Sequence, residues 1–355
     1  MRKAAFFDMP EDEALALTDR AETMHLASLG EGGQPVLRAL HVVRVGRAFY
    51  FHGAPVGEKT ETYGALAVLS AVEDVARIPS HFLDPERACP ATTLYRSVQL
   101  HGRLDRVVEP DEKARALLAL MKKLQPEGGY EPITAESPLY TKALAGIDVV
   151  RLVPDVIQGK KKLGQNRTPA ERARLYAGLL GRGEPGDYAA VEAILGANPD
   201  DTRPPALLAE DGTPLLADLD EARIDEAAVL LEGAYWLEGV PRETVLGAFR
   251  SSRVRVGAAG SDGRLVAAAR ATSDGRVAWI FDVIVTPEAR GRGLAMALMK
   301  LLLGHPAVRD AQVVRLGTRD AAGLYAKLGF ADVREAPLRK YPVIEMARRR
   351  ANAST

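Results

Sequence analysis

One stretch of the chain combines a strand, a glycine-rich turn and an amphipathic helix without interruption. Residues 281–300 read Phe-Asp-Val-Ile-Val-Thr-Pro-Glu-Ala-Arg-Gly-Arg-Gly-Leu-Ala-Met-Ala-Leu-Met-Lys, with the helix starting near Leu294. The first turn of a helix leaves backbone N–H groups without partners and carries a partial positive charge, so it binds phosphate groups well. Gly291 and Gly293 lack side chains that would keep a phosphate away from this backbone. The sequence therefore predicts a pyrophosphate-binding site in the C-terminal part of the chain.

This turn differs from the common nucleotide-binding motifs, because neither Gly-x-x-x-x-Gly-Lys-Ser/Thr nor a complete Gly-x-Gly-x-x-Gly is present. A second element follows at residues 316–330, where a strand end leads into a short helix that stops at Gly329. The segments Arg290-Gly-Arg-Gly-Leu-Ala295 and Leu324-Tyr-Ala-Lys-Leu-Gly-Phe330 together resemble the acetyl-CoA-binding core of the GNAT N-acetyltransferases. The resemblance extends back to about Leu219.

The resemblance implies a GNAT fold over residues 218–350, with a mixed central sheet and helices on both sides. The pattern predicts a first helix at Asp225–Leu237, hairpin strands at Arg253–Ala258 and Leu265–Ala271, and a central strand at Val277–Val285.

The same resemblance implies that Tyr325 protonates the departing CoA thiolate, whereas the plainer alternative is an aromatic side chain that packs a helix. Asp282 lies inside an apolar run, where an unpaired charge is costly, so it should have either a partner or a task, and we predict a catalytic role for it. The residues implied to bind acetyl-CoA are Val283, Val285, Arg290, Gly291, Arg292, Gly293, Leu294 and Ala295.

The acetyl acceptor is defined less sharply, as an amine of a small molecule or a protein N-terminus or lysine. Trp236, Arg270 and Asp320 are candidates for lining its site, and Asp274 precedes the central strand; packing or surface charge is the alternative for each. The family often has Asn seven residues before the tyrosine, where this chain has Thr318. That departure weakens any transfer of detailed acceptor chemistry.

Composition limits the remaining possibilities. The 355 residues are too many for one small domain, and the 47 basic residues balance the 47 acidic ones, so no overall field favours nucleic acid or membranes. The sole cysteine, Cys89, excludes intrachain disulfides and cysteine-based metal clusters. We expect a cytoplasmic protein without a metal site, a membrane segment or a nucleic-acid partner.

The first half of the chain has a different pattern, in which short strands separated by polar turns predominate. Helices are predicted at Glu11–Arg20 and Glu109–Leu124. Many strands with few helices favour a closed or partly closed antiparallel barrel. The predicted strands are Met24–Ser28, Val36–Val43, Ala48–His52, Ala67–Val72, Thr93–Leu100 and Leu104–Val108.

Three segments of this half, at residues 36–41, 49–59 and 94–102, resemble the flavin-binding split barrels of the pyridoxamine-phosphate-oxidase-like superfamily. The middle segment is similar to the strand-to-helix turn that holds the FMN phosphate, with Lys59 at the start of the helix. The residues implied to contact FMN are Arg38, His52, Gly53, Lys59, Arg96, Ser97 and Gln99.

The run Gly159-Lys-Lys-Lys-Leu-Gly-Gln-Asn-Arg167 resembles the tail of PaiB-like proteins, so the nearest subgroup is the nitroimidazole-resistance-like and PaiB-like flavin proteins. This chain has Gly164 where that tail usually has Ser. We predict a split-barrel domain with a helical C-terminal extension at residues 1–200, a linker at residues 201–217, and the acetyltransferase domain after it.

The resemblances imply a bifunctional fusion, in which an acetyl-CoA-dependent N-acetyltransferase is joined to an FMN-binding oxidoreductase barrel that dimerises around its flavin. One alternative is a regulatory or sensing barrel without turnover. Another is a haem-binding barrel, for which His41, His52 and His101 are the possible axial ligands. A barrel that holds no cofactor is a third reading.

Overall fold

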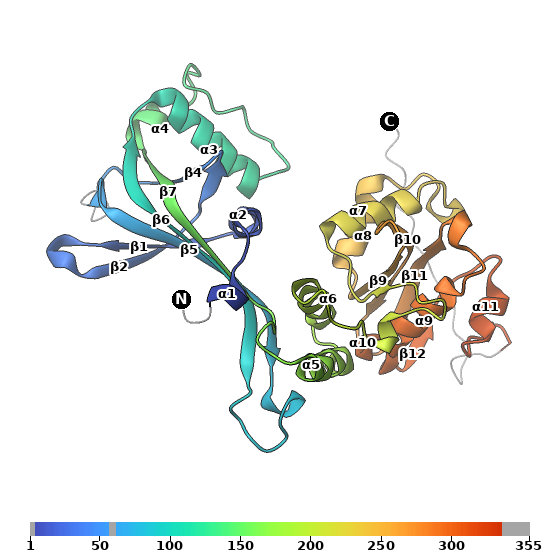
Figure 1. Ribbon diagram of the computed structural model, residues 1–355. Coiled ribbons are helices and arrows are strands. Elements are labelled where there is room, and N and C mark those ends of the chain that lie inside the picture. Colours follow the sequence, from blue (N-terminus) through green and yellow to red (C-terminus); the bar gives the residue numbers. More distant parts are fainter. Residues whose placement is uncertain (1–3, 57–61, 336–355) are drawn as a thin grey trace. The chain divides into compact units, whose positions relative to one another are not determined.

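The computed structural model describes residues 4–56 and 62–335, which form two compact units (Figure 1). The first unit extends to Leu208 and includes Leu216–Asp220, and the second comprises Ala209–Leu215 and the chain from Glu221 onward. Within the predicted linker lies a short 3-10 turn, Pro205–Leu207. None of the helices in the described part of the chain is long and apolar enough to cross a membrane.

The first unit is built on a curled antiparallel sheet (Figure 1). Its strands are β1 (Met24–Leu29), β2 (Pro35–Leu40), β3 (Val43–Val45), β4 (Ala48–Gly53), β5 (Leu66–Ile78), β6 (Thr92–Val107) and β7 (Asp148–Lys162). They lie in the order β2-β1-β5-β6-β7-β4-β3. Side chains alternate between the two faces, and Leu26, Leu69 and Leu100 share the face that forms the core. The predicted split barrel is confirmed.

The long strands β6 and β7 differ from the sequence prediction. Residues 92–107 form one strand instead of two, because Gly102 allows the backbones to meet: a Cβ there would lie 2.6 Å from the Val153 carbonyl oxygen. Strand β7 has no counterpart among the predicted strands, since Pro154 is unusual in a central strand. The structure pairs Pro154 with Gly102 beside a β-bulge, where a residue without an N–H is tolerated.

Helices cover parts of this sheet and extend the unit beyond it. They are α1 (Ala4–Phe7), α2 (Glu11–Arg20), α3 (Pro110–Leu124), α4 (Thr141–Gly146), α5 (Pro169–Arg182) and α6 (Asp187–Ala197). The apolar stripe of α3 packs on Tyr50, Val107 and Val149. Helix α5 begins with a capping box between Thr168 and Glu171.

A buried ion pair fixes α5 to the chain that follows α6. The Arg172 Nη2 donates to Asp201 Oδ1 at 2.5 Å, and the Tyr176 hydroxyl donates to Asp201 Oδ2 at 2.6 Å. The hydrogen bond from Arg172 is the main reason why the pKa of Asp201 lies below its ordinary value of 3.8. The stability that this carboxylate contributes is therefore present above pH 3.8 and is lost as the pH falls through its lowered pKa.

Replacing Asp201 by Ala is expected to lower the free energy of unfolding by about 3–5 kcal/mol, because Arg172 would remain buried without its partner. Urea unfolding measures this loss. The exposed neighbour Asp200 provides the matched control, and Asp200→Ala is expected to change the unfolding midpoint little. Equal effects of the two substitutions would contradict the role given to the ion pair.

The second unit contains a mixed sheet with the order β12-β11-β10-β9-β8. The strands are β8 (Leu215–Leu216), β9 (Val254–Ala259), β10 (Leu265–Ser273), β11 (Val277–Val285) and β12 (Val313–Arg315). Strands β9, β10 and β11 are antiparallel, whereas β12 runs parallel to β11. The helices are α7 (Glu221–Leu230), α8 (Arg242–Ser251), α9 (Leu294–Gly304), α10 (Pro306–Arg309) and α11 (Ala322–Ala326). This architecture confirms the predicted mixed sheet with packed helices.

The predicted helix Asp225–Leu237 is too long, because α7 ends at Leu230. Gly233 follows with φ +79°, a left-handed conformation that stops a helix, and a 3-10 turn then spans Tyr235–Leu237. Helix α8, which packs beside α7, has no counterpart among the predicted helices.

Candidate functional site

The glycine-rich turn after β11 has the conformation that its sequence requires. A short 3-10 turn at Pro287–Ala289 leads to Gly291 and Gly293, which both have φ +78°. Any other residue would be strained in this left-handed region. Gly293 is the N-cap of α9, so the turn delivers the chain directly into the helix.

The first turn of α9 is open to a ligand. No side chain caps it, and none of its first residues is acidic. A Cβ placed on Gly291 or Gly293 would meet nothing within 4 Å, so no described residue beyond their chain neighbours crowds this side of the backbone. Unsatisfied N–H groups facing open space fit the pyrophosphate of acetyl-CoA.

The side chains of this segment have several different surroundings. The Arg290 Nε donates to the Val285 carbonyl at 3.3 Å, while Leu294 is buried in the core and offers only its backbone. The Arg292 guanidinium is held by Asp211, with Nε to Oδ2 at 2.8 Å, and also donates to the Thr213 hydroxyl. Sequence reasoning missed this anchor, because Asp211 and Thr213 precede Arg292 by about 80 residues. Val283, Val285 and Ala295 are half-buried.

Strand β11 keeps one edge partly free. Its parallel pairing with β12 ends at Trp279 and Arg315, although β11 continues to Val285. Beyond Trp279 this edge has no strand partner among the described residues, so its backbone groups can hydrogen-bond to a ligand. Val283 and Val285, predicted to bind acetyl-CoA, lie on this free part of the strand.

A β-bulge interrupts the other edge of β11 at Asp282. The pairing with β10 shifts register around this residue, and Asp282 is the one described non-glycine residue with positive φ, at 55°. Its side chain is buried; Oδ2 accepts from Arg270 Nε at 2.5 Å, and Oδ1 accepts from the Trp236 indole N–H at 3.1 Å. Strained backbone of this kind is concentrated at functional sites.

Tyr325 on α11 and Asp282 on β11 line the same cavity of 420 Å³. The Tyr325 side chain is buried, and burial raises the pKa of its phenol above the ordinary value of 10. A phenol that keeps its proton at neutral pH can act as a general acid. The cavity is lined by Tyr235, Trp236, Leu237, Arg270, Trp279, Ile280, Phe281, Asp282, Val283, Leu316, Gly317, Thr318, Asp320, Ala321 and Tyr325.

The acceptor candidates from the sequence divide into two groups. Trp236, Arg270 and Asp320 all line the cavity of Tyr325. Asp274 does not, because it lies before β11 and accepts hydrogen bonds from the backbone N–H groups of residues 276 and 277. Thr318 also lines the cavity, where its hydroxyl accepts a hydrogen bond from the Ala321 N–H just before α11.

The residues predicted to hold FMN lie in separate places within one chain. His52 pairs with Val149, and Val149 pairs with Val107 near the end of β6. Ser97 lies ten residues earlier on β6, about 33 Å away along the strand at roughly 3.3 Å per residue. A flavin mononucleotide is shorter than this span, so one copy does not bring both groups to one flavin.

The other predicted FMN contacts are also divided between the two faces of the sheet. Arg96 pairs with Glu73, its Nη1 donating to Oε2 at 3.0 Å. Alternation along β6 places Ser97 and the exposed Gln99 on the face opposite Val98. Arg38 lies on β2, and Gly53 ends β4. Lys59 lies outside the described residues.

Comparison with known families finds one match in each unit. Residues 10–161 match the family model for pyridoxamine 5'-phosphate oxidase, and residues 223–330 match that of the acetyltransferase (GNAT) family. The chain joins a pyridoxamine 5'-phosphate oxidase-like domain to a GNAT domain.

Solved structures are similar to one domain or the other. A Xanthomonas campestris protein assigned as a GNAT-family acetyltransferase is 34% identical, over 37% of this chain and 93% of that one, with a TM-score of 0.31. A Bacteroides thetaiotaomicron protein assigned to 5-nitroimidazole antibiotic resistance is 15% identical, over 43% of this chain and 85% of that one, with a TM-score of 0.35. The flavocytochrome Anf3 of Azotobacter vinelandii is 20% identical, over 46% of this chain and 72% of that one, with a TM-score of 0.40. None of the curated proteins compared with the chain matches it.

The three histidines considered as haem ligands have separate surroundings. His41 is exposed and its Nδ1 contacts the Glu22 carbonyl at 3.1 Å, while His52 is exposed on β4. His101 lies in the middle of β6, and its Nε2 is shielded without a hydrogen-bond partner. Within residues 4–56 and 62–335, no cluster of His, Cys, Asp or Glu could hold a metal ion.

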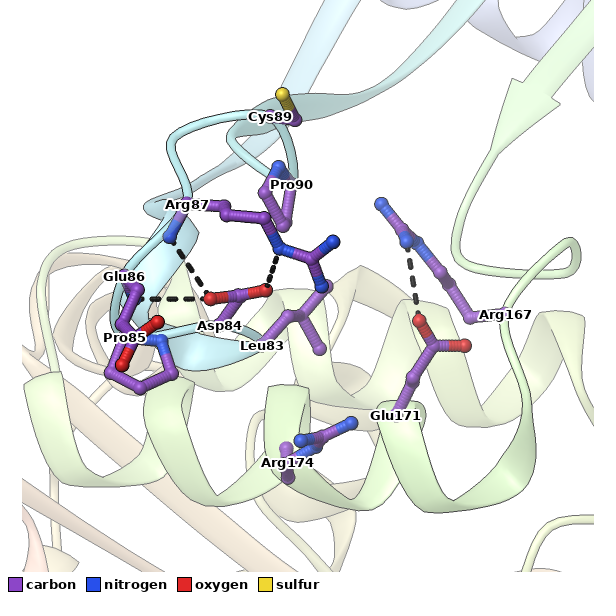
Figure 2. A pocket seen from close by; sticks show the side chains of 10 residues that line it. All are labelled: Leu83, Asp84, Pro85, Glu86, Arg87, Cys89, Pro90, Arg167, Glu171 and Arg174. Carbon is purple, nitrogen blue, oxygen red and sulfur yellow. Dashed lines mark hydrogen bonds and ion pairs between the residues drawn. The ribbon is translucent and has the colours of Figure 1, made fainter.

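The oxidase-like domain also contains a cavity of 680 Å³ that the sequence did not indicate (Figure 2). It lies between the β5–β6 connection and α5. Figure 2 shows Arg167 paired with Glu171, and Arg87 paired with Asp84. The exposed Cys89 is also among its lining residues.

Proposed function

We propose that the GNAT domain transfers the acetyl group of acetyl-CoA directly to a primary amine. The observation that carries this proposal is the open turn at Gly291 and Gly293, which precedes α9 in the same domain that holds the buried Tyr325. The turn and the first N–H groups of α9 hold the pyrophosphate. The free edge of β11 holds the extended arm that carries the thioester.

The chemical step needs two proton transfers but no covalent enzyme intermediate. The neutral amine attacks the thioester carbonyl, the C–S bond breaks, and the electron pair leaves on sulfur. Tyr325 donates its proton to that thiolate, while the amine proton passes to water at the cavity mouth. Backbone N–H groups near the β11 bulge polarise the carbonyl.

Asp282 has a positioning role in this proposal, because both of its oxygens already accept hydrogen bonds from Arg270 and Trp236. Asp282→Asn is expected to raise the KM of the amine about tenfold, the effect of losing roughly 1.4 kcal/mol of binding. The pH dependence of kcat should stay unchanged. Loss of the acidic limb of the kcat profile would instead make Asp282 the general base.

Release of CoA thiol provides the direct test of acetyl transfer. The purified full chain would be mixed with acetyl-CoA and a panel of primary amines, with thiol release and an acetylated product followed together. Thiol release that depends on an amine supports the proposal. Acetyl-CoA that remains intact with every amine would contradict it.

We further propose that the oxidase-like domain binds FMN between two copies of the chain. The face of the sheet opposite Leu26, Leu69 and Leu100 exposes many apolar side chains, a pattern typical of an interface. These side chains belong to Leu29, Leu37, Leu66, Val72, Val153 and Val156. A second copy on this face would bury them and lie against Ser97 and Gln99.

In such a dimer, Ser97 and Gln99 of one copy and His52 and Gly53 of the other would hold the flavin. Bound FMN supplies reversible hydride or electron transfer, which supports an oxidoreductase role for this domain. Heat denaturation of the fresh protein should release about one flavin per chain, as seen in the absorbance spectrum of the supernatant. A haem band, or a colourless supernatant, would contradict FMN binding.

A further inference from the structure

Five aromatic side chains line the cavity that contains Tyr325. Trp279 and Phe281 lie two residues apart on β11 and stack with ring centres 5.9 Å apart. Tyr235 and Trp236 contact each other edge to face, with ring centres 4.9 Å apart. Tyr325 completes the set from α11. Aromatic residues are therefore five of the fifteen residues that line this cavity.

Several of these rings are exposed to an unusual degree. Tyr235 is 41% exposed, Trp236 is 42% exposed and Phe281 is 36% exposed, and all three line the same cavity. Neighbouring apolar surface that remains in contact with water marks a binding site. A volume of 420 Å³ lies within the range of about 300–1,000 Å³ typical of sites for small molecules.

The charges of the cavity favour an acceptor that carries little charge besides its amine. Its charged lining residues are Arg270, Asp282 and Asp320. Arg270 and Asp282 neutralise each other, and Asp320 pairs with Arg319 at 3.4 Å. A polyamine needs several free carboxylates and an acidic acceptor needs free guanidinium groups, and this lining supplies neither.

Guanidinium groups lie over several of the rings, which leaves Trp236 as the ring available to a ligand. Arg319 already lies 3.5 Å from the centre of the Tyr235 ring, and Arg315 lies 4.6 Å from that of Trp279. These contacts are cation–π interactions, and Arg270 makes a third one at 4.6 Å from the centre of the Phe281 ring, so arginines of the chain already occupy these faces. Trp236 is held in place by its hydrogen bond to Asp282, so its ring offers a fixed surface to a ligand.

We propose that the acetyl acceptor is a small arylalkylamine, with its ring against Trp236 and its amine directed towards Tyr325. This inference rests on the proposed acetyl transfer. It adds the class of acceptor, which depends on the aromatic lining and its balanced charge rather than on the acetyl-CoA turn.

Trp236 and Trp279 are the two tryptophans of the chain, so intrinsic fluorescence reports on this cavity directly. The full chain, saturated with CoA, would be titrated with 2-phenylethylamine and with putrescine, which has primary amines but no ring. Phenylethylamine is expected to quench the fluorescence at a concentration at least about tenfold lower than putrescine. In the acetyl-CoA assay it should also give the higher kcat/KM.

Trp236→Ala is expected to weaken phenylethylamine binding about tenfold, read from the remaining Trp279 signal. Phe6→Ala removes an exposed aromatic side chain of the oxidase-like domain and serves as the matched control, with unchanged binding. If the two amines bind with equal affinity while other amines are acetylated, the proposal of an arylalkylamine acceptor is wrong, but the proposal of acetyl transfer still holds. Failure of acetyl-CoA itself to bind or react would overturn both.

Discussion

Tyr325→Phe is expected to lower kcat for acetyl transfer at least about 100-fold, because it removes the proton that the CoA thiolate receives. The ring would remain in place, since Phe fills the same buried position beside Phe330. Acetyl-CoA affinity should therefore change little. Stopped-flow measurement of thiol release separates the chemical step from binding.

Tyr188→Phe is the matched control, because Tyr188 is similarly buried but belongs to the first unit. This variant should transfer acetyl groups at the parent rate. The pH dependence provides a second check: a raised pKa keeps Tyr325 protonated, so the alkaline limit that it sets on kcat should lie above pH 10. An unchanged kcat in Tyr325→Phe would remove Tyr325 from the mechanism.

A mixture of two variants that each fail to bind flavin is expected to regain flavin binding if the FMN site is shared between two copies of the chain. Lys59→Ala would weaken the sequence-predicted phosphate site, and Ser97→Leu would fill the space beside β6. Each variant alone should retain little flavin. After the two variants are unfolded and refolded together, half of the dimers contain one copy of each. In such a dimer one site combines the intact Ser97 of one copy with the intact Lys59 of the other, whereas the second site carries both substitutions.

About one quarter of the parent flavin content should therefore return, because a two-fold symmetric dimer has two equivalent sites. The bound flavin is measured by absorbance after gel filtration. The control is a single variant that carries both substitutions in one chain. After the same unfolding and refolding it should bind no flavin. If the first mixture also restores nothing, the flavin contacts lie within one chain and the shared site is wrong.

The sequence predicts best where local chemistry determines structure. Strand β11 was predicted with its observed ends, and the turn after it follows from Gly291 and Gly293, which a left-handed backbone requires. Helix α2 also matches its prediction, because an amphipathic pattern and an acidic first turn specify it without tertiary help.

Features that depend on distant contacts could not be predicted in this way. Strand β7 is stabilised by pairing with both β6 and β4, and its Pro154 fits only because Gly102 lies opposite. The anchoring of Asp282 by Arg270 and Trp236 joins three separate segments. From the sequence alone, Asp282 had the chemistry of a base but no known partners.

The aromatic residues of the cavity likewise could not be placed together from the sequence alone. Trp279 and Phe281 carry a local signal, since residues two apart on a strand share a face. Tyr235 and Tyr325 come from other elements, and only the fold brings them to this cavity. Residue types were visible in the sequence, whereas their convergence was not.

Calorimetric titration of the full chain with acetyl-CoA tests the central claim most directly. The turn at Gly291 and Gly293 predicts one acetyl-CoA bound per chain in the parent protein. Gly293→Val should abolish this binding, because a branched side chain is strained at φ +78° and projects into the space meant for the pyrophosphate. Flavin content should be unaffected in the variant. Absence of binding by the parent, or equal binding by Gly293→Val, would contradict the account.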